Sequence, residues 1–247
     1  MKVKALGVVV ARKGSKRIKR KNIQPLGGKP LVQWTFECAK KSKKLDRIIV
    51  STDDEAVRKL ALIYEIEVPF FPRPPELSED IDTSLVLKHA VEFLEDKEGY
   101  KPTHVTLLQP TSPFRDPSDI DACIKIAEET ECDTVITITE VSQHPFWMFK
   151  SETGKKGFTR LKPYRKVDLA GDVLVWQNLP KLYYPAGSVY VTRTELIKKG
   201  RIFGNSIYGY VIPRDRAIDI EEEIDLWIAE TIIERKKHIS RWICEGA

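Results

Sequence analysis

The chain has 247 residues, of which 42% are hydrophobic and 31% are charged, and its formal net charge is +5. This length and composition exclude intrinsic disorder, a collagen-like repeat and a small disulfide scaffold. Seven basic residues and no acidic one lie between Arg12 and Lys21, and the rest of the chain nets −2. One basic loop on an otherwise mildly acidic chain indicates a local polyanionic partner.

Apolar runs and helical stripes alternate over residues 4–140. The runs predict buried strands at residues 4–11, 47–52, 67–70, 104–108 and 134–139. Apolar residues at helical spacing lie between them, within Leu31–Ser42, Val57–Tyr64, Leu87–Leu94 and Ile120–Ala127. This alternation predicts an α/β fold with a doubly wound, mostly parallel sheet.

Charged residues and prolines mark the expected helix starts. Pro30 is placed to open the first helix, and Asp53, Asp54 and Glu55 put negative charge at the start of the second. Asp116 followed by Pro117 predicts an N-cap with proline at the first helical position.

The alternation breaks between Glu140 and Gly187, where prolines, tryptophans and tyrosines follow no helical period. We interpret residues 140–187 as an excursion from the core that carries short strands of its own. The core resumes with strands at 188–192 and 208–212 and a short helix near Glu195. A final helix follows, with Ile224, Trp227, Ile228, Thr231 and Ile232 on its apolar face.

The four cysteines, at positions 38, 123, 132 and 244, have no CxxC spacing. We expect buried free thiols in a reducing cytosol rather than a metal site. No apolar run approaches the ~18 residues of a membrane span, and no cleavable signal opens the chain, so we expect a cytoplasmic protein without a membrane partner.

Ligands of open α/β sheets bind beyond the carboxyl ends of the strands, where the basic loop after Ala11 is expected to lie. The loop fits neither GxxxxGK[ST] nor GxGxxG, so it is neither a P-loop nor a dinucleotide fingerprint. Its cations and its glycine are suited to phosphate oxygens, and the alternative is a solvated basic turn.

Two other segments are expected at the same edge of the sheet. Gln109–Arg115 offers an amide and hydroxyls for base and ribose, or is simply a proline turn. Asp219 and Glu221 stand two apart in an extended stretch, so both carboxylates can reach one divalent cation. Asp219 or one of its neighbours could instead cap the last helix, and the two interpretations are compatible.

Five segments then occur in a recognisable order: Arg12–Ile23, Val50–Asp54, Arg73–Leu77, Leu108–Pro113 and Asp219–Glu221. Together they resemble the acylneuraminate cytidylyltransferases, the CMP-sialic acid synthetases, over nearly the whole chain. The resemblance implies one cytidylyltransferase domain over residues 1–247, with a sheet of the nucleotide-diphospho-sugar transferase type. It also implies transfer of CMP from CTP to an acidic nonulosonic sugar, with release of pyrophosphate and with Mg²⁺ or another divalent cation as cofactor.

The resemblance further implies roles for individual residues. The catalytic group is Arg12, Lys21 and Asp219, and Asp219 and Glu221 hold the metal. The nucleotide-binding set is Arg12, Ser15, Lys21, Asn22, Arg73, Ser84 and Gln109. The sugar-binding set is Gln109, Trp147, Trp176, Tyr184 and Tyr190.

The sequence departs from the family pattern on the sugar side. Glu221 replaces a usual aspartate, and Trp147, Trp176 and Tyr184 stand near positions where cationic or amide residues are common. The sugar is therefore open between sialate and 3-deoxy-octulosonate, pseudaminate or legionaminate. The family pairs subunits through the region of the excursion, which predicts a homodimer with a shared sugar site, and the alternative is a lid. A nucleic-acid partner is not expected, because the basic loop holds no aromatic residue.

Overall fold

The computed structural model describes residues 2–154, 158–165 and 175–245. The chain divides into two compact units. Unit 1 consists of Met1–Ile138 and Pro185–Ala247, and unit 2 is Thr139–Tyr184. Unit 2 therefore covers most of the segment that the sequence sets apart from the core.

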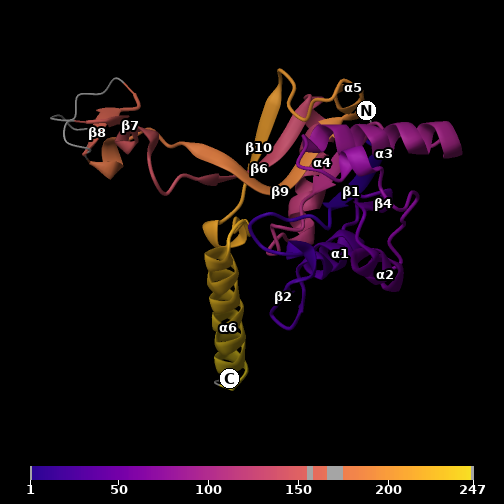
Figure 1. Cartoon of the computed structure of the whole chain (residues 1–247), viewed down its shortest axis with the longest axis horizontal. Coiled ribbons are helices and arrows are strands. Elements are labelled where there is room, and N and C mark those ends of the chain that lie inside the picture. The colour runs from indigo at the N-terminus through magenta and orange to yellow at the C-terminus, as the bar shows by residue number, and fades with distance from the viewer. Residues whose placement is uncertain (1, 155–157, 166–174, 246–247) are drawn as a thin grey trace. The chain divides into compact units, whose positions relative to one another are not determined.

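Unit 1 is built on a six-stranded sheet (Figure 1). The strands are β1 Ala5–Ala11, β4 Arg47–Thr52, β5 His104–Leu108, β6 Thr134–Glu140, β9 Tyr183–Arg193 and β10 Ile207–Val211. Their order is β10-β6-β9-β5-β1-β4. The pairs β1/β4, β1/β5 and β10/β6 are parallel, and β5/β9 is antiparallel. The predicted α/β fold with a mostly parallel sheet is confirmed.

Helices cover both faces of this sheet. They are α1 Leu31–Lys41, α2 Glu55–Ile63, α3 Thr83–Glu98, α4 Pro117–Thr130 and α5 Thr194–Lys198. A further helix, α6 Glu223–Glu245, packs in a separate cluster with Leu26 and Leu31. In β1, Ala5, Val9 and Ala11 belong to the core that α1, α2 and α4 share. Leu6 and Val8 belong to the core under α3 and α5. The continuous apolar run of β1 follows from burial on both faces.

Side-chain caps fix the starts of three helices. Asp54 accepts from the backbone N–H of Ala56 at the start of α2, and Asp82 accepts from that of Ser84 at the start of α3. Asp116 forms a capping box at the start of α4, with Pro117 in the first turn, as predicted. Pro30, in contrast, is the N-cap residue of α1, one position earlier than expected.

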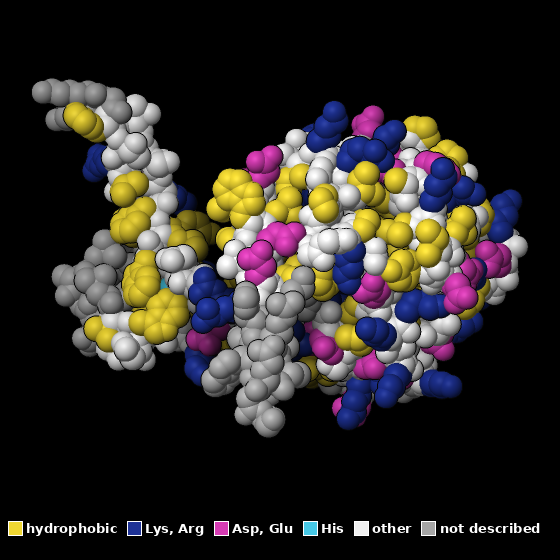
Figure 2. Space-filling view, turned by 90° about the horizontal axis from the view of Figure 1, so that it is seen from below, with side chains coloured by type: hydrophobic (Ala, Val, Ile, Leu, Met, Phe, Trp, Pro, Cys, Tyr) yellow, Lys and Arg dark blue, Asp and Glu magenta, His cyan; other side chains and the backbone are white. Residues whose placement is uncertain are grey.

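Charges of both signs are mixed on the surface of unit 1. Figure 2 shows Lys and Arg side chains interspersed with Asp and Glu over the visible face of this unit. On this face the cations do not form one continuous basic area.

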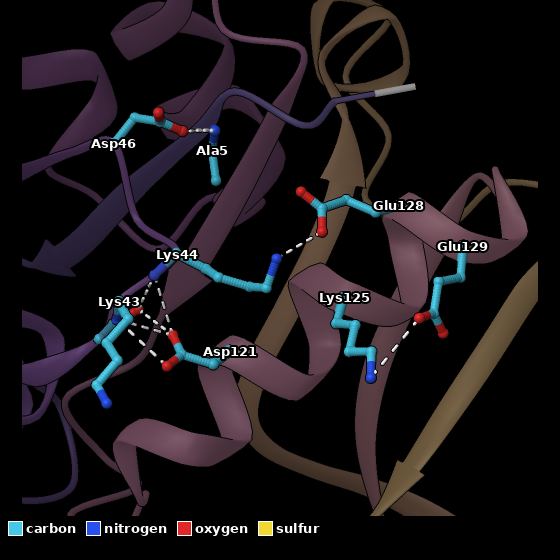
Figure 3. A network of polar contacts seen from close by, with 9 residues as sticks. Ala5, Lys43, Lys44, Asp46, Asp121, Lys125, Glu128 and Glu129 are labelled. Carbon is cyan, nitrogen blue, oxygen red and sulfur yellow. Dashed lines mark hydrogen bonds and ion pairs between the residues drawn. The ribbon is translucent and has the colours of Figure 1, made fainter.

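An acidic residue of α4 fixes the connection between α1 and β4 (Figure 3). The Asp121 carboxylate accepts from Ser42 Oγ at 2.6 Å and from the backbone N–H of Lys43 and Lys44 at 3.0 and 3.2 Å. Lys44 Nζ lies 2.6 Å from Glu128 Oε2 in the same helix. These contacts set where β4 enters the sheet beside β1.

Two predicted elements differ from the structure. The strand expected at residues 67–70 is reduced to a single bridge between Ile49 and Glu67. The predicted apolar face of α6 is not its buried face, because Ile224, Trp227 and Ile228 are exposed, Trp227 by 64%.

The buried side of α6, which packs on the rest of unit 1, carries Ala229 and Ile233. It packs near the turn between β2 (Pro25–Leu26) and β3 (Lys29–Pro30), where Gly27 has a φ of +61°. A Cβ on Gly27 would lie 2.9 Å from Ile233 Cδ1, so this contact requires glycine. Ala229 and Ile233 are enough for close packing of this side. The apolar pattern of the helix sequence alone does not reveal that this side is the buried one.

Unit 2 contains a hairpin and a cluster of rings. Its strands β7 Phe149–Thr153 and β8 Thr159–Pro163 are antiparallel, which confirms the expectation of separate short strands. The ring centroids of Trp147 and Trp176 lie 5.3 Å apart. His144 is buried beside Trp176 and accepts from the backbone N–H of Phe146.

Three of the cysteines, Cys38, Cys123 and Cys132, are buried and free, as predicted. Burial raises the pKa of the Cys38 thiol to about 11. Cys244 lies outside the residues whose side chains the structure describes. In the described part of the chain, no helix combines the length and the apolar character needed to cross a membrane.

Candidate nucleotide site

A cavity of about 410 Å³ lies in unit 1, at the carboxyl ends of β1 and β5. Four segments line it: the basic loop, the stretch from Arg73 to Val86, the turn Gln109–Thr111, and Glu221. Six residues predicted for the nucleotide or the reaction are among its lining residues, namely Arg12, Ser15, Lys21, Asn22, Arg73 and Gln109. The predicted metal ligand Glu221 also lines the cavity.

The backbone of the basic loop is held at both ends. Asn22 is buried, and its Nδ2 donates to the carbonyl oxygen of Arg12 at 2.9 Å, which closes the loop. The backbone N–H of Lys13 donates to Asp53 Oδ1 at 2.8 Å, and Arg20 Nη2 lies 3.1 Å from Asp54 Oδ1. Asp53 and Asp54, at the start of α2, therefore hold the loop in place against the mutual repulsion of its cations.

The cations that line the cavity meet two carboxylates. Arg12 Nη2 and Lys16 Nζ lie 2.9 and 2.8 Å from the oxygens of Asp80. Arg17 Nη1 and Lys21 Nζ lie 2.7 and 3.7 Å from Glu221 Oε2. Four of the loop's seven cations thus line the cavity, although the side chains of Lys16 and Arg17 are 73% and 60% exposed, and the role of the loop toward phosphate stays a prediction.

Lys21 links the basic loop to the segment of Asp219 and Glu221. Its Nζ is mostly buried and donates to the carbonyl oxygen of Ile220 at 2.7 Å. The backbone N–H of Ile220 in turn donates to the carbonyl oxygen of Thr111 at 2.7 Å. Three segments that are distant in the sequence are thus fixed to one another at the cavity.

Asp219 lies behind the cavity wall rather than on it, because the lining residues include Glu221 but not Asp219. Its Oδ1 is buried without a hydrogen-bond partner among the described residues. Burial raises the pKa of the Asp219 carboxyl, and the charge of Glu221 adds to the rise. Gly187, at a φ of +75°, leaves room here, since its Cβ would lie 3.6 Å from the carboxyl carbon.

The suggestion that Asp219 caps the last helix is wrong. Helix α6 begins at Glu223, and the Asp225 carboxylate accepts from the backbone N–H groups of Glu221 and Glu222 at 2.9 and 2.8 Å. The cap is supplied from inside the helix, which leaves Asp219 available for a ligand.

Arg73 is the largest fully buried side chain of the molecule's described part, with 2% of its surface exposed. None of its three guanidinium nitrogens has a hydrogen-bond partner among the residues described. The nearest carboxylate oxygen, Asp53 Oδ1, lies 3.8 Å from Nη2. Burial lowers the pKa of Arg73, and nearby Arg12 lowers it further, against the opposing effect of Asp53. A buried cation on a cavity wall without bonded oxygens is suited to an anionic ligand.

Gln109 is positioned by a second buried arginine. The guanidinium of Arg115 donates to the carbonyl oxygens of Gln109 and Ser188, at 2.7 and 2.5 Å, and to Thr35 Oγ1 at 3.1 Å. The Gln109 side chain is partly buried on the cavity wall. Sequence reasoning placed Arg115 in the right segment but did not give it this supporting role.

Besides Asp219, two residues predicted for the site in unit 1 are not on the cavity wall. Ser84 is buried near the start of α3, and its Oγ has no hydrogen-bond partner among the residues that the structure describes. Tyr190 lies in β9 with its ring 6.1 Å from that of Phe203. Burial raises the pKa of Tyr190, and the charge of Asp219 contributes.

The other predicted sugar residues, Trp147, Trp176 and Tyr184, belong to unit 2. Tyr184 lines a second cavity of about 400 Å³ within unit 2, together with Val141, Met148 and Leu182. The structure brings the two tryptophans together, and their role toward a sugar stays a prediction.

Sequence reasoning missed Asp80. Its neighbours Glu79 and Ile81 line the same cavity, and so does Thr83. The acidic run from Glu79 to Asp82 follows the segment predicted as a strand at residues 67–70, and the carboxyl ends of parallel strands share one edge of the sheet. The position of that run was the available signal.

Within the described residues, no cluster of three or more His, Cys, Asp or Glu side chains could hold a metal ion by itself. Asp219 and Glu221 nevertheless fit a divalent cation. Asp219 Oδ1 is buried and unpartnered among the described residues, and Glu221 lies on the cavity wall with its side chain 49% exposed. Mg²⁺ is commonly held by one or two carboxylates together with phosphate oxygens and water.

A basic loop after the first strand of a mostly parallel sheet, beside a cavity at the carboxyl ends of the strands, is typical of α/β proteins that bind nucleotides. Residues 6–156 match the family model described as cytidylyltransferase, and the chain belongs to this family. The resemblance noted from the motifs is confirmed.

Curated relatives extend over nearly the whole chain. An N-acylneuraminate cytidylyltransferase of Escherichia coli is 30% identical over 96% of this chain and 54% of its own length. A CMP-N,N'-diacetyllegionaminic acid synthase of Legionella pneumophila is 30% identical, over 94% of this chain and 97% of its own. A pseudaminic acid cytidylyltransferase of Campylobacter jejuni is 29% identical, over 93% and 96%. This chain spans about half the length of the Escherichia coli relative.

A solved structure shares the fold. It is a CMP:2-keto-3-deoxy-manno-octonic acid synthetase complexed with CTP, with a TM-score of 0.65 and 16% identity. The similarity covers 94% of this chain and 99% of that one.

Proposed function

We propose that this protein transfers CMP from CTP to an acidic nonulosonic sugar and releases pyrophosphate. The observation that carries the proposal is the unit 1 cavity, where Arg12, Lys21 and Arg73 converge. Family membership supports CTP as the nucleotide. The relatives named for sialic, legionaminic and pseudaminic acids support the class of sugar.

Positioning and charge neutralisation are what such a transfer requires, because the sugar hydroxyl attacks the α-phosphate in line with the leaving pyrophosphate. Arg12 and Lys21 are placed to bind triphosphate oxygens from the basic loop, and Arg73 from the cavity wall. Asn22 closes the loop through its bond to the Arg12 carbonyl, so the cations keep their spacing. Gln109 is held at the same wall by Arg115 and is suited to recognise the nucleotide or the sugar.

We further propose that Asp219 and Glu221 hold Mg²⁺ or another divalent cation together with the phosphates. When bound, such an ion would stabilise negative charge that builds up on the phosphate oxygens. The unpartnered Asp219 oxygen supports this assignment. Lys21 would keep the carboxylate segment against the basic loop through its bond to Ile220.

The test is pyrophosphate release with each of the four NTPs against sialate, legionaminate, pseudaminate and 3-deoxy-octulosonate. We expect turnover that requires a divalent cation, with CTP preferred and one of the first three sugars used best. Absence of turnover with every pair, in folded protein that also fails to bind CTP, would refute the proposal.

We also propose a cytoplasmic homodimer that forms through unit 2, with a sugar site that both subunits share. The exposed apolar side chains of unit 2, including Phe149, Phe158, Leu161 and Tyr184, support an interface. Light scattering on dilute protein tests it, because a chain of 28.3 kDa that stays monomeric during turnover would exclude a shared site.

A further inference from the structure

Asp80 binds two cations of the basic loop at once. Its Oδ1 lies 2.9 Å from Arg12 Nη2, and its Oδ2 lies 2.8 Å from Lys16 Nζ. Arg12 and Asp80 are 68 positions apart, so the contact joins the loop after β1 to the segment before α3. Asp80 and both of its partners line the cavity or its edge, where the nucleotide is proposed to bind.

We propose that Asp80 is a built-in counterion, which stands on Arg12 and Lys16 in the nucleotide-free protein and is displaced by phosphate oxygens when nucleotide binds. The inference rests on the proposed function for the identity of the ligand. A carboxylate presents two anionic oxygens to a guanidinium and an ammonium group much as a phosphate does. Arg12 and Lys16 cannot bind the Asp80 carboxylate and a phosphate group with the same N–H groups at once.

The contact is suited to exchange. The Asp80 side chain is 57% exposed and that of Lys16 is 73% exposed, so solvent screens both ion pairs. The hydrogen bond from Lys16 and the charge of Arg12 keep the pKa of Asp80 below its ordinary value. The counterion therefore stays charged at neutral pH, yet it holds the loop weakly enough for a triphosphate to replace it.

Exchange lowers the apparent affinity for nucleotide. When only the fraction of molecules with a free loop can bind, the apparent dissociation constant rises by the inverse of that fraction. In return, Arg12 and Lys16, two of the seven clustered cations, stay paired between turnovers, which weakens their attraction for other polyanions.

The neighbouring Glu79 provides a matched control. It lines the same cavity and is exposed like Asp80, but it makes no ion pair with any residue described in the structure. Removing its charge changes the field at the cavity by about the same amount without freeing Arg12 or Lys16.

The first experiment is calorimetric titration of the full chain with CTP and Mg²⁺, and separately with inorganic pyrophosphate. We expect Asp80→Asn to lower the dissociation constant of both about threefold to tenfold. Glu79→Gln should change it less than twofold, and Asp80→Glu should stay close to wild type. Equal effects of Asp80→Asn and Glu79→Gln would overturn the proposal, and so would weaker binding by Asp80→Asn.

The second experiment needs no activity. Trypsin cleaves after lysine and arginine, so the nucleotide-free loop is a substrate once its side chains are released. We expect faster cleavage within residues 12–21 in Asp80→Asn than in wild type or Glu79→Gln, and equal rates would overturn the proposal. A difference in cleavage in a protein that binds no CTP would support the counterion and refute the proposed function.

Discussion

Replacing Arg73 with methionine should leave the fold intact and remove tight nucleotide binding. The side chain is buried, and its three nitrogens have no hydrogen-bond partner among the described residues. A buried charge without hydrogen bonds, and with its nearest carboxylate oxygen at 3.8 Å, costs stability. Methionine, which is of similar length, should therefore raise the free energy of unfolding or leave it unchanged, within about 2 kcal/mol. For a chain of this size, that corresponds to a rise of at most about 4–8 °C in Tm.

The same substitution should weaken nucleotide binding, although it does not weaken the fold. If two triphosphate oxygens bind the Arg73 guanidinium, the loss of these charge-assisted bonds costs about 3 kcal/mol, or roughly a hundredfold in the dissociation constant for CTP. Calorimetric titration with CTP and Mg²⁺ and urea unfolding of the same preparations measure both quantities.

The matched control is Arg115→Met. Arg115 is also buried, but each of its three guanidinium nitrogens donates a hydrogen bond, to Ser188, Thr35 and Gln109. Its removal leaves buried carbonyl groups without donors and should cost about 3 kcal/mol or more of stability. If Arg73→Met destabilises the protein as much as Arg115→Met and keeps CTP affinity, Arg73 is a structural partner of Asp53 and the reasoning fails.

Three further outcomes are expected. Arg12→Ala should lose at least about 2 kcal/mol of transition-state stabilisation, seen as a fall of at least roughly thirtyfold in kcat/KM for CTP, and near-normal turnover would exclude Arg12 from triphosphate binding. Asp219→Asn should abolish Mg²⁺-dependent turnover and change the free energy of unfolding by less than about 1 kcal/mol, because the buried Oδ1 has no hydrogen-bond partner among the described residues and the amide keeps an oxygen for the hydrogen bond from Thr111. A Mg²⁺ titration beside urea unfolding checks this. Burial lowers the pKa of His104 to about 4, so the unfolded chain takes up a proton first as the pH falls below 6.5, and stability is lost on the way to pH 4. His104→Gln should remove roughly 2–3 kcal/mol of this loss. Urea unfolding of variant and wild type at pH 7 and pH 4.5 measures the difference, and an equal loss of stability in both proteins would contradict the prediction.

The strands of unit 1 could be predicted because their burial leaves a simple mark in the sequence. β1 is apolar without a break, since α1, α2 and α4 cover one face and α3 and α5 the other. The caps at Asp54 and Asp116 were equally readable, because a short acidic side chain before a helix satisfies free N–H groups. Both signals are local, and tertiary structure left them unchanged.

The misses came from features that depend on distant partners. Residues 67–70 have the composition of a strand, but only Glu67 meets a neighbour, Ile49. The apolar stripe of α6 at Ile224, Trp227 and Ile228 is exposed because Gly27 accepts a different side of the helix. Gly27 lies some 200 positions before α6, and a single sequence gives no indication that the two are in contact.

The candidate site was predictable where the chemistry is concentrated in one segment. Lys21 and Asn22 stand in the basic loop, and the structure places both on the cavity wall. Asp80 was missed because its function toward the loop depends on distance in space, not on a motif. Ser84 was placed by resemblance alone, and it lies buried in α3 instead of on the wall.

The position of β9 in the sheet has a consequence for synthesis of the chain. β9 lies between β5 and β6, although it comes after both in the sequence. A growing chain can pair β4, β1 and β5 early, but β6 has no route into the same sheet until residue 193 has emerged. The bond from Lys21 to Ile220, 199 positions apart, forms later still. A nascent or truncated chain therefore exposes strand edges that can pair wrongly, and it cannot close the basic loop against the carboxylates. Nucleotide binding should thus begin only once nearly all of unit 1 has been made, which makes CTP a probe of complete folding during translation.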